Sequence, residues 1–221
     1  MVTTTLDLSQ RINWLEWFSS TYFDQLNPKS SGAKRGLIEG HIQRGPGFQQ
    51  IFQRLLNRRS TNFHIIETGT LRNPGNWKDG QSARLFTEFV DYHGGWVKSV
   101  DIDIEAVAIA TKTIKSKNFT AFHGDSVQWL QQQDNLHMVD LFYLDSYDVK
   151  WEDDHNSAEH HLKEFQAIEP HLKAGALVAI DDNSRLLSNN QRTGKGRRIV
   201  EYLESIGRRP VYDAYQIIYQ F

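Results

Sequence analysis

The stretch Ile65-Ile66-Glu67-Thr68-Gly69-Thr70, with the loop that runs from Leu71 to Ser82, decides the fold of this chain. An apolar, β-rich run that stops at an acidic residue, turns on glycine and then opens a helix is how α/β sheets build a nucleotide-sized pocket above their first strand. We therefore place a strand at residues 63–67 and expect a helix to start at Ser82, which is a good N-cap residue.

Strands and helices alternate from this stretch to the C-terminus. Short β-rich runs alternate with segments whose apolar residues recur at helical spacing. Five such units, followed by a β-rich end with a turn near Asp213 and Ala214, predict an α/β fold. We expect a doubly wound, mostly parallel seven-stranded sheet with a C-terminal antiparallel hairpin. The predicted strands are 63–67, 96–100, 119–123, 139–144 and 175–180, and the predicted helices are 12–26, 47–57, 82–92, 104–115, 126–132, 158–168 and 197–206.

The N-terminal part is expected to be a helical extension of the sheet domain. We place this extension, a cap or lid, at residues 1–60 and the sheet domain at residues 61–221. The loop 27–36 is rich in glycine, serine and lysine, so it is either a linker or a lid. The aromatic helix 12–26 packs either on its own sheet or on a second subunit, which leaves a homo-oligomer open.

Composition limits the classes of function. The 221 residues include 39% hydrophobic and 24% charged residues, no cysteine, and a formal net charge of −2. A disulfide framework, a thiolate metal site and a cysteine nucleophile are therefore excluded, and any metal must bind oxygen or histidine. The charge gives no general reason to expect nucleic acid or a membrane as partner. With no signal-peptide pattern and no membrane-length apolar run, we expect a cytoplasmic enzyme.

An acidic residue stands at or just beyond the end of each of the five predicted parallel strands, where ligands bind in such sheets. A dinucleotide site would need the pattern G-x-G-x-x-G, whose amides and helix dipole hold phosphate. Here a single glycine follows Glu67, and a carboxylate stands where phosphate would come. This pattern favours a ligand with a positive centre and no phosphate, and S-adenosylmethionine fits. The acidic residues are Glu67, Asp101, Asp125, Asp145 and the pair Asp181-Asp182.

Three of these carboxylates, Asp145, Asp181 and Asp182, follow two strands that we expect to be neighbours. Their like charges repel one another in a small volume unless a cation or a proton is present. Oxygen donors alone suit Mg²⁺, Mn²⁺ or Ca²⁺ better than zinc. A divalent metal and a metal-free site both stay open at this point.

The order of these motifs resembles class I S-adenosylmethionine-dependent methyltransferases from about Phe63 to the C-terminus. Glu-x-Gly with the later Gly80-Gln81-Ser82 looks most like the macrocin O-methyltransferase and cephalosporin hydroxylase-like group, whose members use a divalent metal in methyl transfer to a hydroxyl. The chain departs from that group by the intervening residues Leu71 to Asp79. The motifs are Glu67-Thr68-Gly69-Thr70, Val100-Asp101-Ile102-Asp103, Gly124-Asp125-Ser126, Leu144-Asp145-Ser146-Tyr147-Asp148 and Ile180-Asp181-Asp182-Asn183.

The resemblance implies a Rossmann-like methyltransferase fold and a set of cofactor contacts. Glu67, Gly69, Thr70 and Ser82 would surround the methionine end of S-adenosylmethionine, with Asp145 also in the site. Asp101 would accept hydrogen bonds from the ribose hydroxyls, unless it only caps a helix; Asp103 competes for that role. Asp125 and Ser126 would meet the adenine edge, or else cap a helix.

The resemblance also implies Mg²⁺ at Asp145, Asp181 and Asp182, where it would acidify an acceptor hydroxyl. For the catalytic base the sequence offers Asp145, Asp148 and His155, and histidine has a suitable ordinary pKa. The expected activity is O-methylation of a small hydroxylated molecule. The alternatives are a metal-independent methyltransferase acting on nitrogen or on a macromolecule, and a scaffold that binds the cofactor without turnover.

Overall fold

The computed structural model describes residues 8–27, 37–38, 43–58, 61–77 and 79–221, with no side-chain detail for residues 8–12. The predicted linker or lid at 27–36 thus lies almost wholly outside the described residues. The helices are α1 (Leu8–Leu26), α2 (Gly45–Leu56), α3 (Ser82–His93), α4 (Ile104–Thr113), α5 (Ser126–Gln131), α6 (His155–Ile168) and α7 (Arg197–Ser205), and two 3₁₀ turns are Leu136–Met138 and Glu169–His171. The strands are β1 (Phe63–Thr68), β2 (Gly95–Asp101), β3 (Phe119–His123), β4 (Leu141–Leu144), β5 (Leu177–Ile180), β6 (Asn183–Arg185), β7 (Arg192–Gly194), β8 (Tyr212–Asp213) and β9 (Ile217–Gln220).

The main sheet has seven strands in the order β3-β2-β1-β4-β5-β9-β8. Strands β1 to β5 are parallel, while β9 runs antiparallel to β5 and pairs with β8 as the terminal hairpin. The predicted doubly wound, mostly parallel sheet with a C-terminal hairpin is confirmed, and its strand order is that of the Rossmann-like methyltransferase fold. The chain order reverses between β1 and β4, so the carboxyl ends of these two strands form the crevice in which such folds bind ligands.

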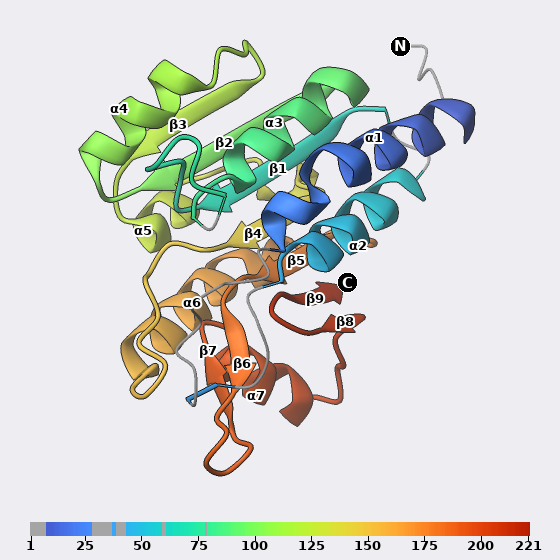
Figure 1. The fold of residues 1–221 in the computed structure, drawn as a ribbon. Helices are drawn as coiled ribbons and strands as arrows, with labels where there is room; N and C mark the ends of the chain where they lie inside the picture. The colour runs from blue at the N-terminus through green and yellow to red at the C-terminus, as the bar shows by residue number, and fades with distance from the viewer. Residues whose placement is uncertain (1–7, 28–36, 39–42, 59–60, 78) are drawn as a thin grey trace.

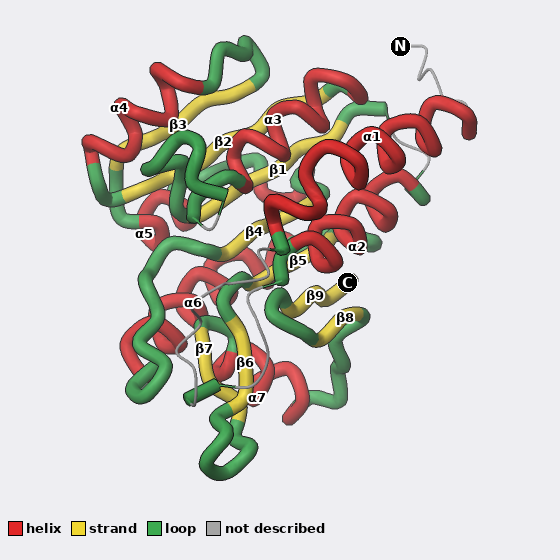
Figure 2. The backbone as a smooth tube through the Cα atoms, viewed as in Figure 1, coloured by secondary structure: helices red, strands yellow, loops and turns green. Residues whose placement is uncertain are grey.

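Alternate residues of the central strands face two separate cores. Leu141 and Tyr143 of β4 pack against α1, α2 and α3, whereas Phe142 and Leu144 pack against α6 and α7. All four side chains are fully buried, because helices cover both faces of a parallel sheet. Figure 2 shows the helices on the two sides of the central strands.

The N-terminal helices belong to the first of these cores. Trp14 of α1 is 3% exposed, and its ring lies 4.5 Å from that of Phe52 in α2 and 4.9 Å from that of Phe89 in α3. The aromatic helix therefore packs on its own sheet domain, the first of the two arrangements considered for it. Figure 1 shows α1 and α2 side by side over this face. Among the described residues, no helix has the length and apolar character needed to cross a membrane.

Two local features differ from expectation. Helix α3 is preceded by Gln81 as its N-cap residue, so Ser82 is the first helical residue and not the cap. Beyond β5 the chain forms an unpredicted two-stranded hairpin, β6 and β7, which leads directly into Lys195. Its strands are only three residues long and polar, so they carry little of the alternation by which strands are recognised.

Replacing Trp14 with alanine should destabilise the protein by about 3–5 kcal/mol, because a large ring is removed from a packed core. Urea unfolding followed by circular dichroism measures this change. Trp17→Ala is the matched control: Trp17 lies in the same helix but is 42% exposed, and it should cost no more than about 1 kcal/mol. Equal effects of the two substitutions would contradict the packing of α1 on the sheet.

Candidate functional site

The crevice between β1 and β4 is shaped by a glycine at the end of β1. Gly69 has a φ of 85°, and a side chain there would bring a Cβ atom to 2.7 Å from the carbonyl oxygen of Asp145. The Gly69 amide donates to the carbonyl of Val100 at 2.8 Å. The turn after β1 is thus held between the ends of β2 and β4, and only glycine fits there.

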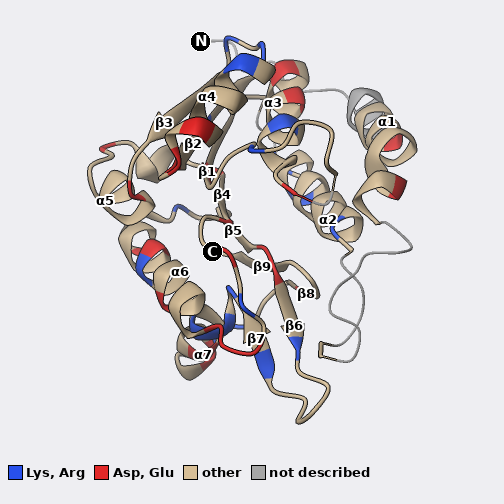
Figure 3. Ribbon diagram, turned by 60° about the vertical axis from the view of Figure 1, so that its left-hand side comes forward, with Lys and Arg blue, Asp and Glu red and all other residues tan. Residues whose placement is uncertain are grey.

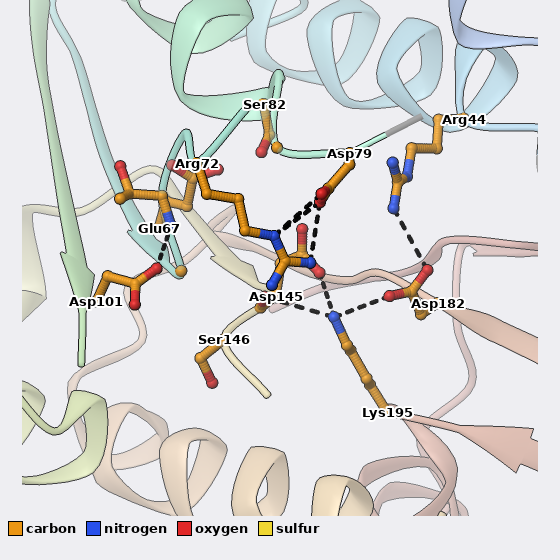
Figure 4. A pocket seen from close by; sticks show the side chains of 13 residues that line it. Arg44, Glu67, Arg72, Asp79, Ser82, Asp101, Asp145, Ser146, Asp182 and Lys195 are labelled. Carbon is orange, nitrogen blue, oxygen red and sulfur yellow. Dashed lines mark hydrogen bonds and ion pairs between the residues drawn. The ribbon is translucent and has the colours of Figure 1, made fainter. Parts of the chain in front are cut away.

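A cavity opens above this turn, with about 380 Å³ of space that is partly open to solvent. Figure 4 shows its polar side chains, which converge from the loops after β1, β2, β4 and β5. We call it the switch-point cavity. Its lining residues are Arg44, Glu67, Gly69, Thr70, Arg72, Asp79, Gly80, Ser82, Asp101, Asp145, Ser146, Asp182 and Lys195.

Glu67 is the buried acid of this cavity. It is 1% exposed, and its Oε2 atom has no hydrogen-bond partner in the described structure. Burial raises the pKa of Glu67 well above its usual range, and the neighbouring Asp145 and Asp101 add to this, although a hydrogen bond with Ser82 opposes it. A buried carboxylate oxygen without a partner is costly unless a ligand supplies a donor or a positive charge.

Asp101 lies at the end of β2, as predicted, and orders the two turns beside it. Its Oδ2 accepts the Thr70 amide at 3.0 Å and its Oδ1 accepts the Asp103 amide at 2.8 Å. Burial raises its pKa. Each oxygen keeps a second lone pair for a ligand. Asp103 is exposed, caps α4 by accepting the Glu105 amide and is not among the residues that line the switch-point cavity.

A second cavity, of about 520 Å³, lies beside the first; we call it the lateral cavity. Asp125 lines it and also accepts the Gln128 amide at 2.9 Å, so it caps α5 while facing the cavity. The Ser126 hydroxyl points away, towards Glu164. The residues that line this cavity are Val100, Asp101, Ile102, Asp125, Ser126, Ser146, Tyr147 and His160.

Glu164 is the centre of a buried hydrogen-bond network next to the two cavities; we call it the Glu164 network. Glu164 is fully buried and accepts hydrogen bonds from the hydroxyls of Thr68 at 3.1 Å, of Ser146 at 2.6 Å and of Ser126. Burial opposes its ionisation, but His161, His160 and the hydroxyls outweigh it and lower its pKa to about 2. This network was not predicted, although a pair of histidines three and four residues before a glutamate places them on one helix face.

The two histidines of the network differ in charge. Burial lowers the pKa of His161 to about 4 despite the nearby Glu164, so His161 is neutral near pH 7. The hydrogen bond between His160 and Glu164 raises the pKa of His160. Glu164 therefore favours the charged form of the half-buried His160, whereas burial disfavours the charged form of His161.

The structure brings Asp145, Asp181 and Asp182 together, as their strand positions predict; we call them the carboxylate cluster. Lys195 lies among them and pairs with Asp145 Oδ1 and, at 2.8 Å, with Asp182 Oδ2. Arg44 completes the pairing, with its Nε at 2.8 Å from Asp181 and its Nη2 at 3.4 Å from Asp182. In the ribbon of Figure 3, acidic residues follow the end of β5 and basic residues lie along the nearby hairpin of β6 and β7.

These charges set the protonation of the carboxylate cluster. Burial opposes ionisation of Asp182, but Lys195 and Arg44 outweigh it and lower its pKa. Burial raises the pKa values of Asp181 and Asp145 in spite of the same two cations. Burial by itself lowers the pKa of Lys195. The negative charges of Asp145, Asp182 and Asp181 outweigh this effect and raise the pKa. Lys195 is therefore an ammonium ion.

The predicted Mg²⁺ site does not fit this arrangement. Lys195 and Arg44 already occupy both oxygens of Asp182 and one oxygen of each of the other two acids. Across the described part of the chain, no group of three or more histidine, aspartate or glutamate side chains is placed to hold a metal ion. The carboxylates were predicted, but the two cations that balance them were missed.

The predicted bases Asp148 and His155 lie outside the buried site. Asp148 has a side chain that is 74% exposed, and Arg72 binds it at 2.9 Å. His155 is exposed at the first turn of α6 and is not among the residues that line either cavity. Of the three predicted catalytic residues, the structure places only Asp145 at the switch-point cavity.

The intervening loop after Thr70 is organised around Gln81. The side-chain amide of Gln81 donates to the backbone carbonyls of Asn73 at 3.0 Å and Asn76 at 3.2 Å. Arg72 forms ion pairs with Asp79 of the same loop and with Asp148 on the loop after β4. Each nitrogen–oxygen distance is 2.9 Å. The loop therefore reaches across the switch-point cavity, where selectivity for a ligand can be set.

Comparison with known proteins gives matches to solved structures only. No protein-family model matches the chain, and no curated protein does. MycE methyltransferase from the mycinamycin biosynthetic pathway, in complex with Mg and SAH, is 19% identical, with 76% of this chain and 39% of MycE covered and a TM-score of 0.48. Cofactor-bound Rv0187 from MTB is 14% identical, with 78% of this chain and 65% of Rv0187 covered and a TM-score of 0.43. An S-adenosylmethionine-dependent methyltransferase from Mesorhizobium loti is 14% identical, with 71% of this chain and 65% of that protein covered and a TM-score of 0.39.

This chain thus spans less than two-fifths of the length of MycE. Identities below 20% and TM-scores below 0.5 establish nothing about activity. The assignment of the fold rests on the strand order itself.

The buried neutral His161 should make stability fall as the solution is acidified. Between its ordinary pKa of about 6.5 and its folded value of about 4, the unfolded chain binds a proton that the folded chain does not, so stability is lost as pH falls through this window. The difference amounts to about 3 kcal/mol. Urea unfolding at pH 7, 6, 5 and 4 measures it.

In His161→Gln this part of the acid destabilisation should disappear, while His155→Gln, which changes an exposed histidine of the same helix, should retain it. If His161→Gln lost as much stability on acidification as the unmodified protein does, the assigned charge state of His161 would be wrong.

Proposed function

We propose that this protein is an S-adenosylmethionine-dependent methyltransferase that acts on an oxygen atom of a small hydroxylated molecule. The observation that carries the proposal is the buried carboxylate of Glu67, whose Oε2 has no partner and which lines a cavity at the switch point of a seven-stranded sheet. An ammonium group is the complement that such a carboxylate requires. A phosphate in the same place would be repelled.

The other residues of the site suit the remaining parts of this ligand. Asp101, at the end of β2, has free lone pairs for two ribose hydroxyls. The lateral cavity begins at Asp101 and extends between Ile102 and Tyr147, so it offers apolar surface for a planar base. Thr70 and Ser82 stand beside Glu67 at the opposite end. The order from Glu67 to the lateral cavity follows the order of ammonium, ribose and adenine in S-adenosylmethionine.

The acceptor has its own space next to Glu67. A smaller cavity of about 210 Å³ shares Arg44, Gly80, Ser82 and Asp145 with the switch-point cavity. Its other walls are largely apolar. They are formed by Leu26, Phe48, Trp77, Gln81, Tyr143 and Asp181. The character of these walls suits an acceptor with an apolar body and a hydroxyl directed at Asp145.

S-adenosylmethionine, when bound, supplies an electrophilic methyl group on its sulfonium: the acceptor oxygen forms a bond to the methyl carbon while the carbon–sulfur bond breaks and leaves its electron pair on sulfur. The chain's own residues position the partners and take up the proton. Asp145 lines both cavities, so its carboxylate is placed to accept the hydroxyl proton. Because burial raises the pKa of Asp145, it is a stronger base than an exposed aspartate. Most of the rate enhancement is expected from alignment of the two substrates.

Calorimetric titration tests the proposal. S-adenosylhomocysteine should bind the unmodified protein, and Glu67→Gln should weaken binding about tenfold to a hundredfold, because a charge-assisted hydrogen bond to the ligand ammonium is lost. Asp134→Asn, which removes an exposed acid far from the cavities, should bind as the unmodified protein does.

Binding of NAD without binding of S-adenosylhomocysteine would refute the proposed function. So would unchanged affinity in Glu67→Gln. Once binding is established, methyl transfer to a panel of small hydroxylated acceptors identifies the substrate class.

A further inference from the structure

The position of Lys195 has a consequence for the chemistry of the site. Its Nζ atom is surrounded by Asp145 Oδ1, by Asp182 Oδ2 at 2.8 Å and by the backbone carbonyl of Asp145 at 3.4 Å. These are the kinds of oxygen donor that a hard divalent cation would use. The ammonium group thus lies where a metal would balance the two acids.

The backbone around Lys195 is built to bring it there. Gly194 has a φ of 114°, and a Cβ atom at that position would lie 2.1 Å from the carbonyl oxygen of Asp182. On the other side, the Gly196 amide donates to Asn183 Oδ1 at 2.7 Å, and a Cβ atom would lie 2.5 Å from that oxygen. The two glycines therefore let the chain press against the segment that follows β5. The side chain of Lys195 is 2% exposed as a result.

The positive charges of Lys195 and Arg44 disfavour the binding of a second cation at the carboxylate cluster. Arg44 lies against Asp181 and Asp182 from the other side, and the Tyr215 hydroxyl donates to Asp182 Oδ1. A divalent cation would have to displace Lys195, or else sit in a low-dielectric site beside two positive side chains. A buried lysine that loses its carboxylate partners is strongly unfavourable.

We propose that Lys195 replaces the divalent metal, so that the carboxylate cluster works with a built-in ammonium cation. The inference rests on the proposed function for its chemical meaning: Lys195 lines the switch-point cavity and donates a hydrogen bond to the acceptor oxygen as negative charge develops on it. An ammonium group has three donors, and two of them are taken by Asp145 and Asp182. The third is directed at the backbone carbonyl of Asp145 at 3.4 Å, a long contact that an acceptor oxygen would replace.

Binding of Mn²⁺, followed by electron paramagnetic resonance of the free ion, tests the inference without any assay of activity. The unmodified protein should show no saturable binding below about 1 mM Mn²⁺, which is the weak end of protein sites for hard cations. Lys195→Met removes the charge, retains much of the apolar stem and leaves the three acids in place. It should bind Mn²⁺ at least about tenfold more tightly than the unmodified protein.

Two variants serve as controls. Lys195→Arg keeps a cation and should not gain Mn²⁺ binding. Lys173→Met removes a lysine that pairs with the buried Asp140 at 2.8 Å at the start of β4, and it should not gain binding either. Thermal unfolding checks that each variant is folded; the titration of the unmodified protein decides the inference even if Lys195→Met does not fold.

Saturable Mn²⁺ binding to the unmodified protein that is lost in Asp182→Asn would overturn the inference. A folded Lys195→Met that binds no Mn²⁺ would overturn it as well, since the cluster would then be no cation site for Lys195 to fill. Titration of S-adenosylhomocysteine with and without a chelator separates this result from the proposed function. Equal affinity in both solutions supports the inference, and loss of affinity with the chelator refutes it. A protein that binds no S-adenosylhomocysteine refutes the proposed function, while the Mn²⁺ result still decides the role of Lys195.

Discussion

The close contact between Gly69 and the backbone of Asp145 is the constraint on which the site depends. A Cβ atom at Gly69 would lie 2.7 Å from the Asp145 carbonyl oxygen, so any other residue would push the ends of β1 and β4 apart. That separation would move Glu67 away from Asp145 and widen the crevice where the strand order reverses. A single glycine with positive φ thereby couples the packing of the sheet to the shape of the cavity above it.

The parallel strands and the acids at their ends were predictable from the sequence because they follow short-range rules. A fully apolar run such as Val139 to Leu144 indicates a strand covered on both faces, and the residue after such a strand lies at the ligand-binding edge. Asp145, Asp181 and Asp182 were therefore correctly expected to lie together. The helix start at Ser82 was predicted correctly, but its N-cap residue is Gln81, whose side chain also holds the loop before the helix.

The cations of the site were not predictable in the same way. Arg44 lies 138 residues before Asp182 in the chain, in the segment before α2, and no periodic pattern connects them. Lys195 follows a hairpin whose strands are too short and polar to be recognised from the sequence. The position of an acid at a strand end follows from the order of the strands. The position of a basic side chain in a distant loop depends on the path of that loop, which the sequence pattern does not show.

The loop after β4 is held from two sides, and this explains how a buried cluster of charges can be both stable and accessible to a ligand. Beneath it, the Thr68 hydroxyl accepts the Asp145 amide at 3.2 Å and donates to Glu164, which also binds Ser146. Above it, Lys195 binds the carboxylate of Asp145. Glu164 accepts hydrogen bonds from three hydroxyls and lies beside His160, whereas Lys195 pairs with Asp145 and Asp182. Burial of charged side chains is costly in isolation. The hydrogen bonds from Thr68 and Glu164 nevertheless hold the loop after β4 in place. The hydrogen bonds of the Glu164 network and the ion pair with Lys195 thus hold Asp145 from both sides, which lowers the reorganisation that a preorganised site requires.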